Sequence, residues 1–337
     1  MTFDEFIHQW KDSNDFVPVM TSGSTGNPKE ILLKKDFMAR SAKRTNRFFN
    51  LNQESLLHSC VAADFIGGKM MAVRSFLAGA YFSWERPTNS PLTSLSKNIE
   101  IDLLAVVPSQ MLYIVSNLKD LPHLRNIIVG GSAIHPGLRE KICSESISAF
   151  ETYGMTETAS HIALRKITKK ETPFITLPGI SLEIDSDNCL VINFEEGESI
   201  HTNDIVELIS PTEFFVKGRK DNIIISGAKK INPSELEGFF SKIISQDFCV
   251  TGLPDEKWGT KVVMVIEGKE NCQMAANILE EAKKSLDAWK IPKEIIFIPH
   301  LPRTINGKII PPKDSALLAS LKHDICLCDV KQNRPKL

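Results

Sequence analysis

A loop rich in hydroxyl side chains and glycine, which ends in a lysine, is the segment best suited to chemistry. Residues 21–29 read Thr-Ser-Gly-Ser-Thr-Gly-Asn-Pro-Lys. Its hydroxyl groups belong to Thr21, Ser22, Ser24 and Thr25. Gly23 and Gly26 let the backbone turn tightly and approach a ligand closely, and Lys29 adds a cation suited to phosphate oxygens. The segment predicts a site for a run of phosphates, and an ordinary surface turn is the alternative.

This loop is not a Walker phosphate-binding loop, in which Gly-x4-Gly-Lys-Ser/Thr opens a helix. Pro28 directly precedes the lysine, and the apolar run at residues 31–33 predicts a strand. The phosphate site expected here therefore differs from that of a P-loop enzyme.

Four further motifs follow the loop along the chain. They are Tyr-Gly-Met-Thr-Glu-Thr at 153–158, His-Thr-Asn-Asp at 201–204, Gly-Arg-Lys-Asp-Asn-Ile-Ile-Ile-Ser-Gly at 218–227 and Pro-Arg-Thr-Ile-Asn-Gly-Lys at 302–308. With the loop, they resemble the ATP-dependent adenylate-forming superfamily of acyl-CoA synthetases, peptide-synthetase adenylation domains and luciferases. The resemblance runs from residue 17 to residue 313. It is closest to the o-succinylbenzoate–CoA ligases of menaquinone synthesis, in the segments 107–110, 154–160 and 253–259.

The resemblance implies an enzyme that uses ATP and Mg²⁺ to convert a carboxylic acid into an acyl-adenylate, and then passes the acyl group to CoA. Its partners would be a small carboxylic acid, here o-succinylbenzoate, and CoA. Two alternatives stay open. One is an adenylation enzyme that loads a carrier protein, although no carrier segment is visible in this chain. The other is a non-catalytic nucleotide sensor built on a shortened fold.

Phosphate and metal contacts are implied for two of the motifs. By the resemblance, the 21–29 loop folds over the β- and γ-phosphates of ATP, with Lys29 at its exit. Thr156 corresponds to a threonine that touches the α-phosphate, and Glu157 to a carboxylate that holds Mg²⁺, an ion that favours one carboxylate plus phosphate oxygens. Alone, Thr156 and Glu157 would also fit a helix N-cap followed by a first-turn acid.

Nucleoside contacts are implied for three further segments. Asp204 lies in Thr-Asn-Asp, where the family usually has Thr-Gly-Asp, and its carboxylate would accept the ribose hydroxyls while Arg219 donates to the same sugar. Tyr153 would stack on adenine, and a core aromatic is the alternative. Backbone close to the base is expected from Gly130, Gly131, Ser132 and Ala133.

The C-terminal motifs imply a lysine that changes place. Lys308 corresponds to the lysine that reaches the carboxylate and the α-phosphate during adenylation, and for this residue in isolation a solvated turn is the alternative. Asp221 stands at the family's hinge, near 219–221, between an adenylate-forming core at 1–218 and a mobile C-terminal domain at 222–337. Gly227 is expected to allow close approach of the backbone in the CoA-dependent state.

The acyl pocket matches the family less well, because its usual Phe-His element has no clear copy at residues 63–68. A helix is predicted at 67–80, with a buried stripe formed by Ile66, Met70, Val73 and Leu77. Arg74 adjoins this stripe, and a partly buried guanidinium needs an anion or several acceptors. We predict that Arg74 binds the second carboxylate of the acid. The alternatives are a structural salt bridge and a side chain that extends to solvent.

The elements needed to position these residues indicate a mixed α/β fold. Buried parallel strands are predicted at 101–107 and 126–129, with a helix at 109–118. Alternating patterns predict a β-rich subdomain, with a hairpin at 182–194 and strands at 205–209 and 214–216. A small C-terminal α+β domain would contain a helix at 233–243, a strand at 261–266, a helix at 273–286 and a strand at 294–298. By the resemblance, the family's first subdomain is truncated before the loop. A homodimer is one way to cover the edges this exposes.

The composition limits which partners and which cellular compartment are expected. The 337 residues include 40 basic and 41 acidic side chains, so a net charge of −1 gives no general attraction to nucleic acid or anionic membranes. Seven cysteines without a Cys-x-x-Cys pair fit reduced thiols. The N-terminal residues lack the apolar core of a signal peptide, and no apolar run is long enough to span a bilayer. We expect a cytoplasmic protein.

Overall fold

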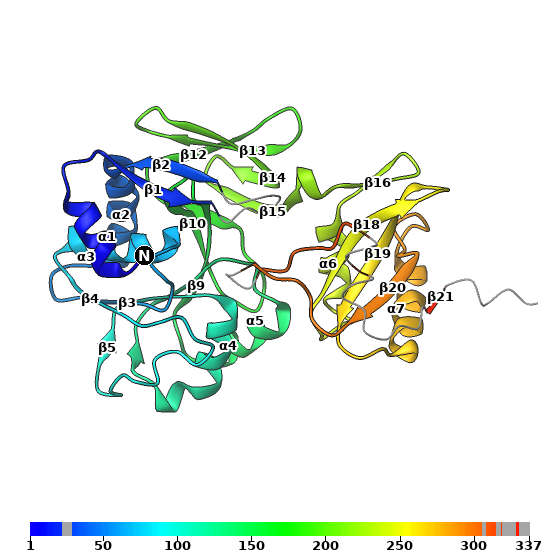
Figure 1. Cartoon of the computed structure of the whole chain (residues 1–337), viewed down its shortest axis with the longest axis horizontal. Helices are drawn as coiled ribbons and strands as arrows, with labels where there is room; N and C mark the ends of the chain where they lie inside the picture. The colour runs from blue at the N-terminus through cyan, green and yellow to red at the C-terminus, as the bar shows by residue number, and fades with distance from the viewer. Residues whose placement is uncertain (22–28, 305–307, 315–317, 319–327, 330–337) are drawn as a thin grey trace, which may run out of the picture. The chain divides into compact units, whose positions relative to one another are not determined.

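The computed structural model describes residues 1–21, 29–304, 308–314, 318 and 328–329 (Figure 1). The chain divides into two units. The first comprises Met1–Thr202 and Glu207–Phe215, and the second comprises Asn203–Val206 and Val216–Leu337. The division falls within two long strands, β14 (Ser199–Ser210) and β15 (Glu213–Arg219).

An 11-stranded sheet is the scaffold of the first unit, with the strand order β12-β13-β14-β15-β11-β10-β9-β8-β6-β3-β4. Neighbouring strands are parallel from β4 to β9. These strands are β3 (Leu56–Ser59), β4 (Tyr81–Trp84), β6 (Leu103–Val106), β8 (Ile127–Val129) and β9 (Ala149–Met155). Strands β6 and β8 confirm the two predicted parallel strands, and every residue of both is buried.

Five α-helices belong to the described part of this unit. They are α1 (Phe3–Lys11), α2 (Lys35–Phe49), α3 (Ile66–Ala78), α4 (Pro108–Asn117) and α5 (Pro136–Ser144), and the 3-10 helix η1 (Leu118–Asp120) follows α4. In Figure 1, α1, α2 and α3 lie together, apart from α4 and α5. Leu104 and Val106 of β6 share a core with Met111 of α4 and Ile142 of α5. Helices α3 and α4 confirm the predictions at 67–80 and 109–118.

Helix α3 differs from its prediction in how much of it is buried. A single stripe was expected, but all residues from Gly68 to Ser75 are buried, and Ile66 and Leu77 of the predicted stripe are only partly so. The helix ends where Gly79 takes φ 67°, a left-handed angle that glycine adopts without a steric penalty. Lys69 and Arg74 are therefore both enclosed rather than placed beside solvent.

The antiparallel part of the sheet forms the predicted β-rich region. It contains β10 (Ser160–Lys166), β11 (Phe174–Thr176), β12 (Ile180–Ile184) and β13 (Cys189–Phe194), together with β14 and β15. The predicted hairpin at 182–194 is β12 paired antiparallel with β13. Two small sheets accompany the large one: β1 (Phe16–Met20) with β2 (Glu30–Lys34), and β5 (Glu100–Ile101) with β7 (His123–Leu124). Strand β2 contains the apolar run at 31–33.

The second unit has its own sheet, with the order β18-β19-β20-β21. Its elements are η2 (Lys220–Asn222), β16 (Ile224–Ser226), β17 (Lys229–Ile231), α6 (Pro233–Phe240), β18 (Phe248–Asp255), β19 (Gly259–Glu267), α7 (Cys272–Ser285), β20 (Glu294–Ile298) and β21 (Cys328–Asp329). Phe240, Met264 and Ile278 lie in its core. The four predicted elements are present, although α6 ends at Phe240 and β18 was not predicted. Among the described residues of the whole chain, no helix has the length and apolar character needed to span a membrane.

Candidate active site

The predicted phosphate loop joins two antiparallel strands, because β1 ends at Met20 and β2 begins at Glu30. Its base is closed by two hydrogen bonds. The backbone N–H of Thr21 donates to the carbonyl of Lys29 (2.8 Å), and the N–H of Lys29 donates to Oγ1 of Thr21 (3.1 Å). Lys29 is exposed. The remaining residues predicted to touch phosphate, Ser22, Gly23, Ser24, Thr25 and Gly26, lie outside the described residues.

A tight turn between β9 and β10 presents the second motif. Thr156 and Glu157 occupy this turn and not the start of a helix, so the helix-cap alternative is wrong. Glu157 is exposed. The turn is braced by buried Thr158, whose Oγ1 accepts from the N–H of Met155 (3.0 Å). Gly154 is required beside it, because a Cβ there would lie 2.2 Å from the carbonyl oxygen of Ser160.

The predicted adenine segment begins where β8 ends. Gly130 donates to the carbonyl of Val106 (3.0 Å), and Gly131 follows with φ 94°. After Gly130, Gly131 and Ala133 are exposed and Ser132 is partly buried. Strand β9 lies beside β8 in parallel, with Val129 opposite Glu151. Tyr153, two residues after Glu151, therefore emerges at the same carboxyl edge of the sheet as Gly131, which is where open α/β sheets bind ligands.

Tyr153 is also part of an aromatic cluster. Its ring centroid lies 4.9 Å from that of Phe214 and 5.8 Å from that of Phe174, and the side chain is only partly buried. The contact with Phe214 is edge-to-face, an arrangement that holds a ring in place. The core-aromatic alternative and the proposed stacking are compatible, since one edge of the ring is packed while part of its surface stays accessible.

Glu151 was not predicted, although it supports the same segment. Its buried carboxylate accepts from Arg139 (3.1 Å) and Arg165 (2.8 Å), and it lies 3.4 Å from the backbone N–H of Ile134. A buried carboxylate needs such partners to offset its loss of hydration. The network ties the end of segment 130–134 to β9.

Arg74 is fully buried, with 1% of its surface exposed. Its Nη2 contacts Oγ of Ser160 (3.2 Å) and Nδ1 of His161 (3.4 Å), while its Nε has no hydrogen-bond partner within the described part of the chain. Among the described residues, no carboxylate forms a salt bridge with it. Burial lowers the pKa of Arg74 to about 9. The guanidinium is thus an enclosed cation to which the described residues supply no counter-ion, and neither the structural salt bridge nor the solvent-extended alternative describes it.

His161 orients Arg74 through a contact inside the protein. Burial, and then the charge of Arg74, lowers the pKa of His161 well below its ordinary value, so the ring is neutral. A neutral ring can accept from Arg74 at Nδ1 and donate from Nε2 to Oγ1 of Thr45, 2.9 Å away. Ser160 faces Arg74 from a backbone with φ 86°, directly after Ala159 with φ 49°. Two consecutive non-glycine residues in the left-handed region indicate local strain, which often accompanies a functional site.

The second unit brings together residues from three separate motifs. Arg219 donates to Asp221 through Nε (2.9 Å) and Nη2 (2.9 Å), and its Nη1 lies 3.2 Å from Oδ1 of buried Asp204. The hydrogen bonds from Arg219 lower the pKa of Asp221 below its ordinary value. The planar guanidinium thereby sets the positions of both carboxylates.

Lys308 belongs to the same cluster. It pairs with Thr304, whose N–H donates to the carbonyl of Lys308 (2.8 Å) and whose Oγ1 accepts from the N–H of Lys308 (3.1 Å). Burial, and then the charge of Arg219, lowers the pKa of Lys308, while Asp204 and Asp221 act in the opposite sense. Lys308 is partly buried, so a fully solvated turn does not describe it.

Gly227 occupies the two-residue turn between β16 and β17, followed by Ala228, and both have positive φ (53° and 63°). This is the turn geometry that suits a tight hairpin. Its N–H donates to the carbonyl of Trp258 (3.0 Å), and an added Cβ would lie 2.9 Å from the Trp258 ring. Glycine is required here for backbone angle and for space.

The predicted residues therefore fall into two groups. One group, within the first unit, contains Thr21, Lys29, Arg74, Gly131, Ser132, Ala133, Tyr153, Thr156 and Glu157. The other, within the second unit, contains Asp204, Arg219, Asp221, Gly227 and Lys308. Sequence reasoning missed Thr158, Glu151 and His161. Glu151 could have been predicted from its position, because it is an acidic residue at a strand position whose side chain faces the interior.

Comparison with known proteins gives two family matches. Residues 5–206 match the model described as AMP-binding enzyme, and residues 245–308 match the AMP-binding enzyme C-terminal domain. The chain is similar to 2-succinylbenzoate–CoA ligase of Listeria monocytogenes, with 27% identity over 90% of this chain and 70% of the relative. It is also similar to the ligase of the same name from Geobacillus, with 25% identity over 90% of this chain and 69% of that one.

The chain is also similar to solved structures of AMP-forming ligases. An acyl-CoA synthetase (AMP-forming)/AMP-acid ligase II-like protein from Dyadobacter fermentans shares 29% identity with a TM-score of 0.59, over 90% of each chain. The o-succinylbenzoate CoA synthetase MenE of Bacillus subtilis, in complex with the acyl-adenylate intermediate OSB-AMP, gives a TM-score of 0.73 at 20% identity. That match covers 87% of this chain and 67% of the synthetase, and it concerns the fold alone.

Proposed function

The chain belongs to the AMP-binding enzyme family, and we propose that it is an AMP-forming acid–CoA ligase acting on o-succinylbenzoate. Such an enzyme joins the acid to the α-phosphate of ATP with loss of pyrophosphate, and then transfers the acyl group to the thiol of CoA. The similarity to two bacterial 2-succinylbenzoate–CoA ligases supports this assignment and a role in menaquinone synthesis.

The observation that carries the proposal is the cluster of Asp204, Arg219, Asp221 and Lys308. These residues come from three motifs, at 201–204, 218–227 and 302–308, and meet within the second unit. Adenylation brings a carboxylate and a triphosphate together, so it requires positioned cations. Lys308, held beside two carboxylates that favour its charged form, supplies such a cation. We assign Asp204 and Arg219 to the ribose.

The first unit would bind the rest of the nucleotide. Lys29 and the 21–29 loop suit the β- and γ-phosphates, Tyr153 and Gly131 suit the adenine, and Thr156 suits the α-phosphate. Glu157 fits a magnesium ion, because its carboxylate is exposed on a turn and hard oxygen ligands are those that Mg²⁺ prefers. When bound, magnesium offsets the negative charge of the phosphates.

Arg74 supports the choice of a diacid. An enclosed guanidinium without a counter-ion is unfavourable unless an anion completes the site. Because Arg74 is fully buried, we propose that it acts on the substrate through the hydroxyl group of Ser160. Its hydroxyl accepts from Arg74 and, being partly exposed, can donate its own proton to a carboxylate. We therefore assign the second carboxylate to the pair Arg74 and Ser160.

The order of events requires a hinge, which we place at Asp221, between a core at 1–218 and a C-terminal domain at 222–337. Asp221 lies in the short helix η2, directly after β15. Rotation there would withdraw Lys308 after adenylation and bring Gly227 into use for CoA.

Two further assignments complete the proposal. A cytoplasmic location agrees with the free thiols of Cys60, Cys143 and Cys249, which are among the described cysteines. A homodimer is proposed as a cover for the edge of strand β4. Small-angle scattering at several protein concentrations tests the second of these.

One assay separates the ligase from its rivals. A ligase exchanges pyrophosphate into ATP only when its acid is present, and then releases AMP when free CoA is added. A nucleotide sensor would show no exchange. An adenylation enzyme for a carrier protein would show exchange but would not use free CoA.

A further inference from the structure

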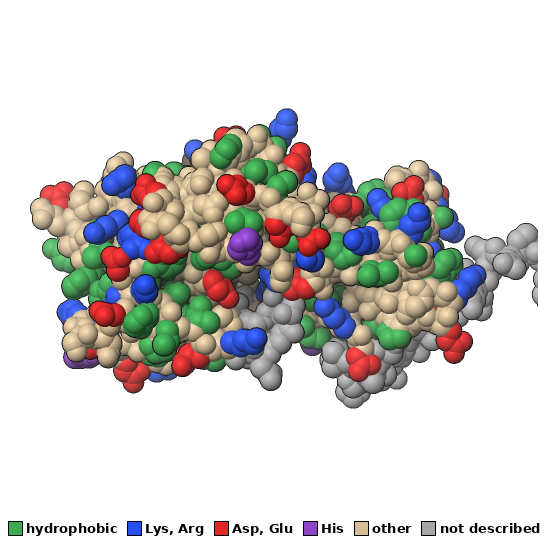
Figure 2. Space-filling model, turned by 90° about the horizontal axis from the view of Figure 1, so that it is seen from above, with side chains coloured by type: hydrophobic (Ala, Val, Ile, Leu, Met, Phe, Trp, Pro, Cys, Tyr) green, Lys and Arg blue, Asp and Glu red, His purple; other side chains and the backbone are tan. Residues whose placement is uncertain are grey.

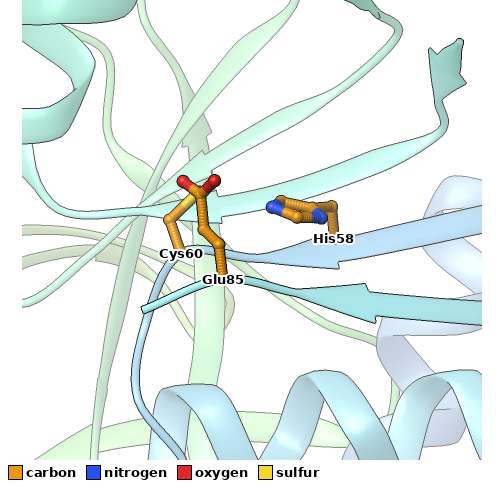
Figure 3. Close-up of side chains that lie close together, drawn as sticks. All are labelled: His58, Cys60 and Glu85. Carbon is orange, nitrogen blue, oxygen red and sulfur yellow. The ribbon is translucent and has the colours of Figure 1, made fainter. Parts of the chain in front are cut away.

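Three side chains that could bind a metal gather at the end of two neighbouring strands, and the proposed reaction uses none of them. Strands β3 and β4 are parallel, with His58 opposite Ser83 and Ser59 opposite Trp84. Cys60 and Glu85 directly follow these strands. Because side chains alternate along a strand, His58 and Cys60 lie on the same face. In Figure 3 the three side chains point toward one another.

The geometry of the three groups suits a single ion. Each residue offers one ligand atom, and these atoms all lie within 4.8 Å of one another. Sγ of Cys60 lies 3.3 Å from Oε1 of Glu85. A shared ion needs only small adjustments to draw these atoms to its usual bond lengths of about 2.0–2.3 Å.

His58 is arranged as a ligand would be. Its Nδ1 lies 2.8 Å from the hydroxyl of Ser83. Its Nε2 is buried and has no hydrogen-bond partner in the part of the chain that the structure describes, and 1% of the residue is exposed. Metal-binding histidines characteristically use one ring nitrogen for the ion while the other is held by a neighbouring polar group. A buried ring nitrogen without a partner is otherwise unfavourable.

The ligand types indicate the class of ion. Cys60 is fully buried and offers sulfur, His58 offers nitrogen and Glu85 offers oxygen. Zinc accepts all three in tetrahedral sites, whereas magnesium and calcium favour oxygen alone. Three protein ligands leave a fourth position for water.

We propose that His58, Cys60 and Glu85 form a binding site for one zinc-class divalent cation. Binding forms a metal–sulfur bond and releases the thiol proton of Cys60 to solvent, with no change of oxidation state. The ion would tie the end of β3 to the segment 85–92. Glu85 already holds that segment through the N–H of Leu92, at 2.9 Å.

The rival interpretation is a hydrogen-bonded core cluster, in which Cys60 donates to Glu85 and His58 merely packs. The two differ in whether the thiol becomes a metal-bound thiolate. Cobalt(II) reports this, because a cobalt–thiolate bond absorbs in the near ultraviolet whereas cobalt bound to oxygen and nitrogen alone does not.

The test uses the full chain, stripped with a chelator and titrated with cobalt chloride. We expect one equivalent of cobalt to produce the thiolate band, and zinc to remove it. Cys60→Ser and His58→Gln should abolish or strongly weaken the band. Two controls should retain it: Cys249→Ser, a buried thiol in the second unit, and a double variant Cys326→Ser with Cys328→Ser.

Absence of the band in the unaltered protein would overturn the proposal, as would an undiminished band in Cys60→Ser. Loss of the band in the Cys326/Cys328 double variant alone would assign it elsewhere and would also reject the site. If the variants at the site fail to fold, the unaltered protein still decides. Zinc should then raise its thermal midpoint, because a ligand that binds only the folded state stabilises it.

Discussion

Nη2 of Arg74 lies 3.2 Å from the hydroxyl oxygen of Ser160 and 3.4 Å from Nδ1 of His161. The two partners have different roles. His161 is neutral and enclosed, so it orients the guanidinium without adding charge. Ser160 is partly exposed and can face a ligand. A buried positive charge would therefore act on the substrate through one hydroxyl group.

We expect Arg74→Gln to reduce activity on o-succinylbenzoate by about 10- to 150-fold, while activity on benzoate-like monoacids changes little. The change removes the charged hydrogen bond from Arg74 to Ser160, the hydroxyl assigned to the second carboxylate, and loss of a hydrogen bond from a charged group accounts for a change of this size. The measurement is kcat/KM for the diacid and for a monoacid. Arg47→Gln, at an exposed position on α2, is the matched control. An equal loss for both acids, with folding intact, would show that Arg74 does not recognise the second carboxylate.

Ser160→Ala tests the path from Arg74 to the substrate. It should selectively impair the diacid, as Arg74→Gln does, because the alanine cannot pass on a hydrogen bond. Combining both changes should give little further loss, since the two residues would act as one unit. Full additivity of the two losses would mean that Arg74 and Ser160 serve different purposes.

Lys308→Ala should lower the rate of adenylation by about 100-fold or more, because a charged stabiliser of the first transition state is lost. Thioester formation from supplied acyl-adenylate should be largely unchanged. Each half-reaction is measured separately, by pyrophosphate exchange and by CoA consumption. Lys269→Ala, at an exposed surface position, is the control. Similar losses in both half-reactions would point to a structural role for Lys308.

Gly227→Ala should destabilise the second unit and slow the CoA-dependent step. Alanine at φ 53° has an unfavourable backbone, by about 1–2 kcal/mol, and its Cβ would press on Trp258. Gly238→Ala is an informative contrast, because a Cβ at that position in α6 meets nothing within 4 Å. That change should stabilise the helix by about 1 kcal/mol. Equal midpoints of thermal unfolding for the two variants would contradict this account of Gly227.

Glu237 gives the second unit a pH-dependent stability. Burial raises the pKa of Glu237 to about 7, above its ordinary value of 4.5. The folded state therefore holds a proton that the unfolded state has lost between these values. The contribution of the protonated Glu237 to the free energy of unfolding is complete below pH 4.5. It is lost as the pH rises to 7, a decrease of up to about 3 kcal/mol.

Glu237→Gln should remove this dependence and raise stability at pH 8, since the amide oxygen can still accept from the N–H of Val250. The measurement is the free energy of unfolding by denaturant at pH 5 and pH 8. Glu235→Gln, at an exposed position in α6, should leave the difference between the two pH values unchanged. A pH difference that persists in Glu237→Gln would exclude Glu237 as its source.

Local patterns in the sequence predicted the elements that depend on local rules. The apolar run that became β6, the alternating pattern of the hairpin β12–β13 and the helical spacing of α4 all carry their own signal. Strand β18 was missed because Gly252 and Pro254 interrupt its apolar pattern, and pairing with β19 overrides that local preference.

The motifs predicted which residues belong to the site, but the partners and burial of those residues depend on contacts between distant parts of the chain. Arg74 and His161 are 87 residues apart, and nothing in the spacing of either indicates that they meet. For Lys308 the motif predicted a catalytic cation, with a solvated turn as the alternative, and it did not indicate the partial burial and the nearby Arg219 charge that lower its pKa. Burial of charged groups depends on the packing of several elements, so it could not be inferred from periodicity alone.

The central claim is tested most directly by measuring AMP release from ATP by the unaltered enzyme, with a panel of acids, with and without CoA. We predict rapid AMP release only when o-succinylbenzoate and CoA are both present, formation of the matching CoA thioester, and loss of the signal in Lys308→Ala. Rapid release with another acid would contradict the substrate assignment and leave the ligase standing. No acid-dependent AMP release under any condition would contradict the claim that this chain is a ligase.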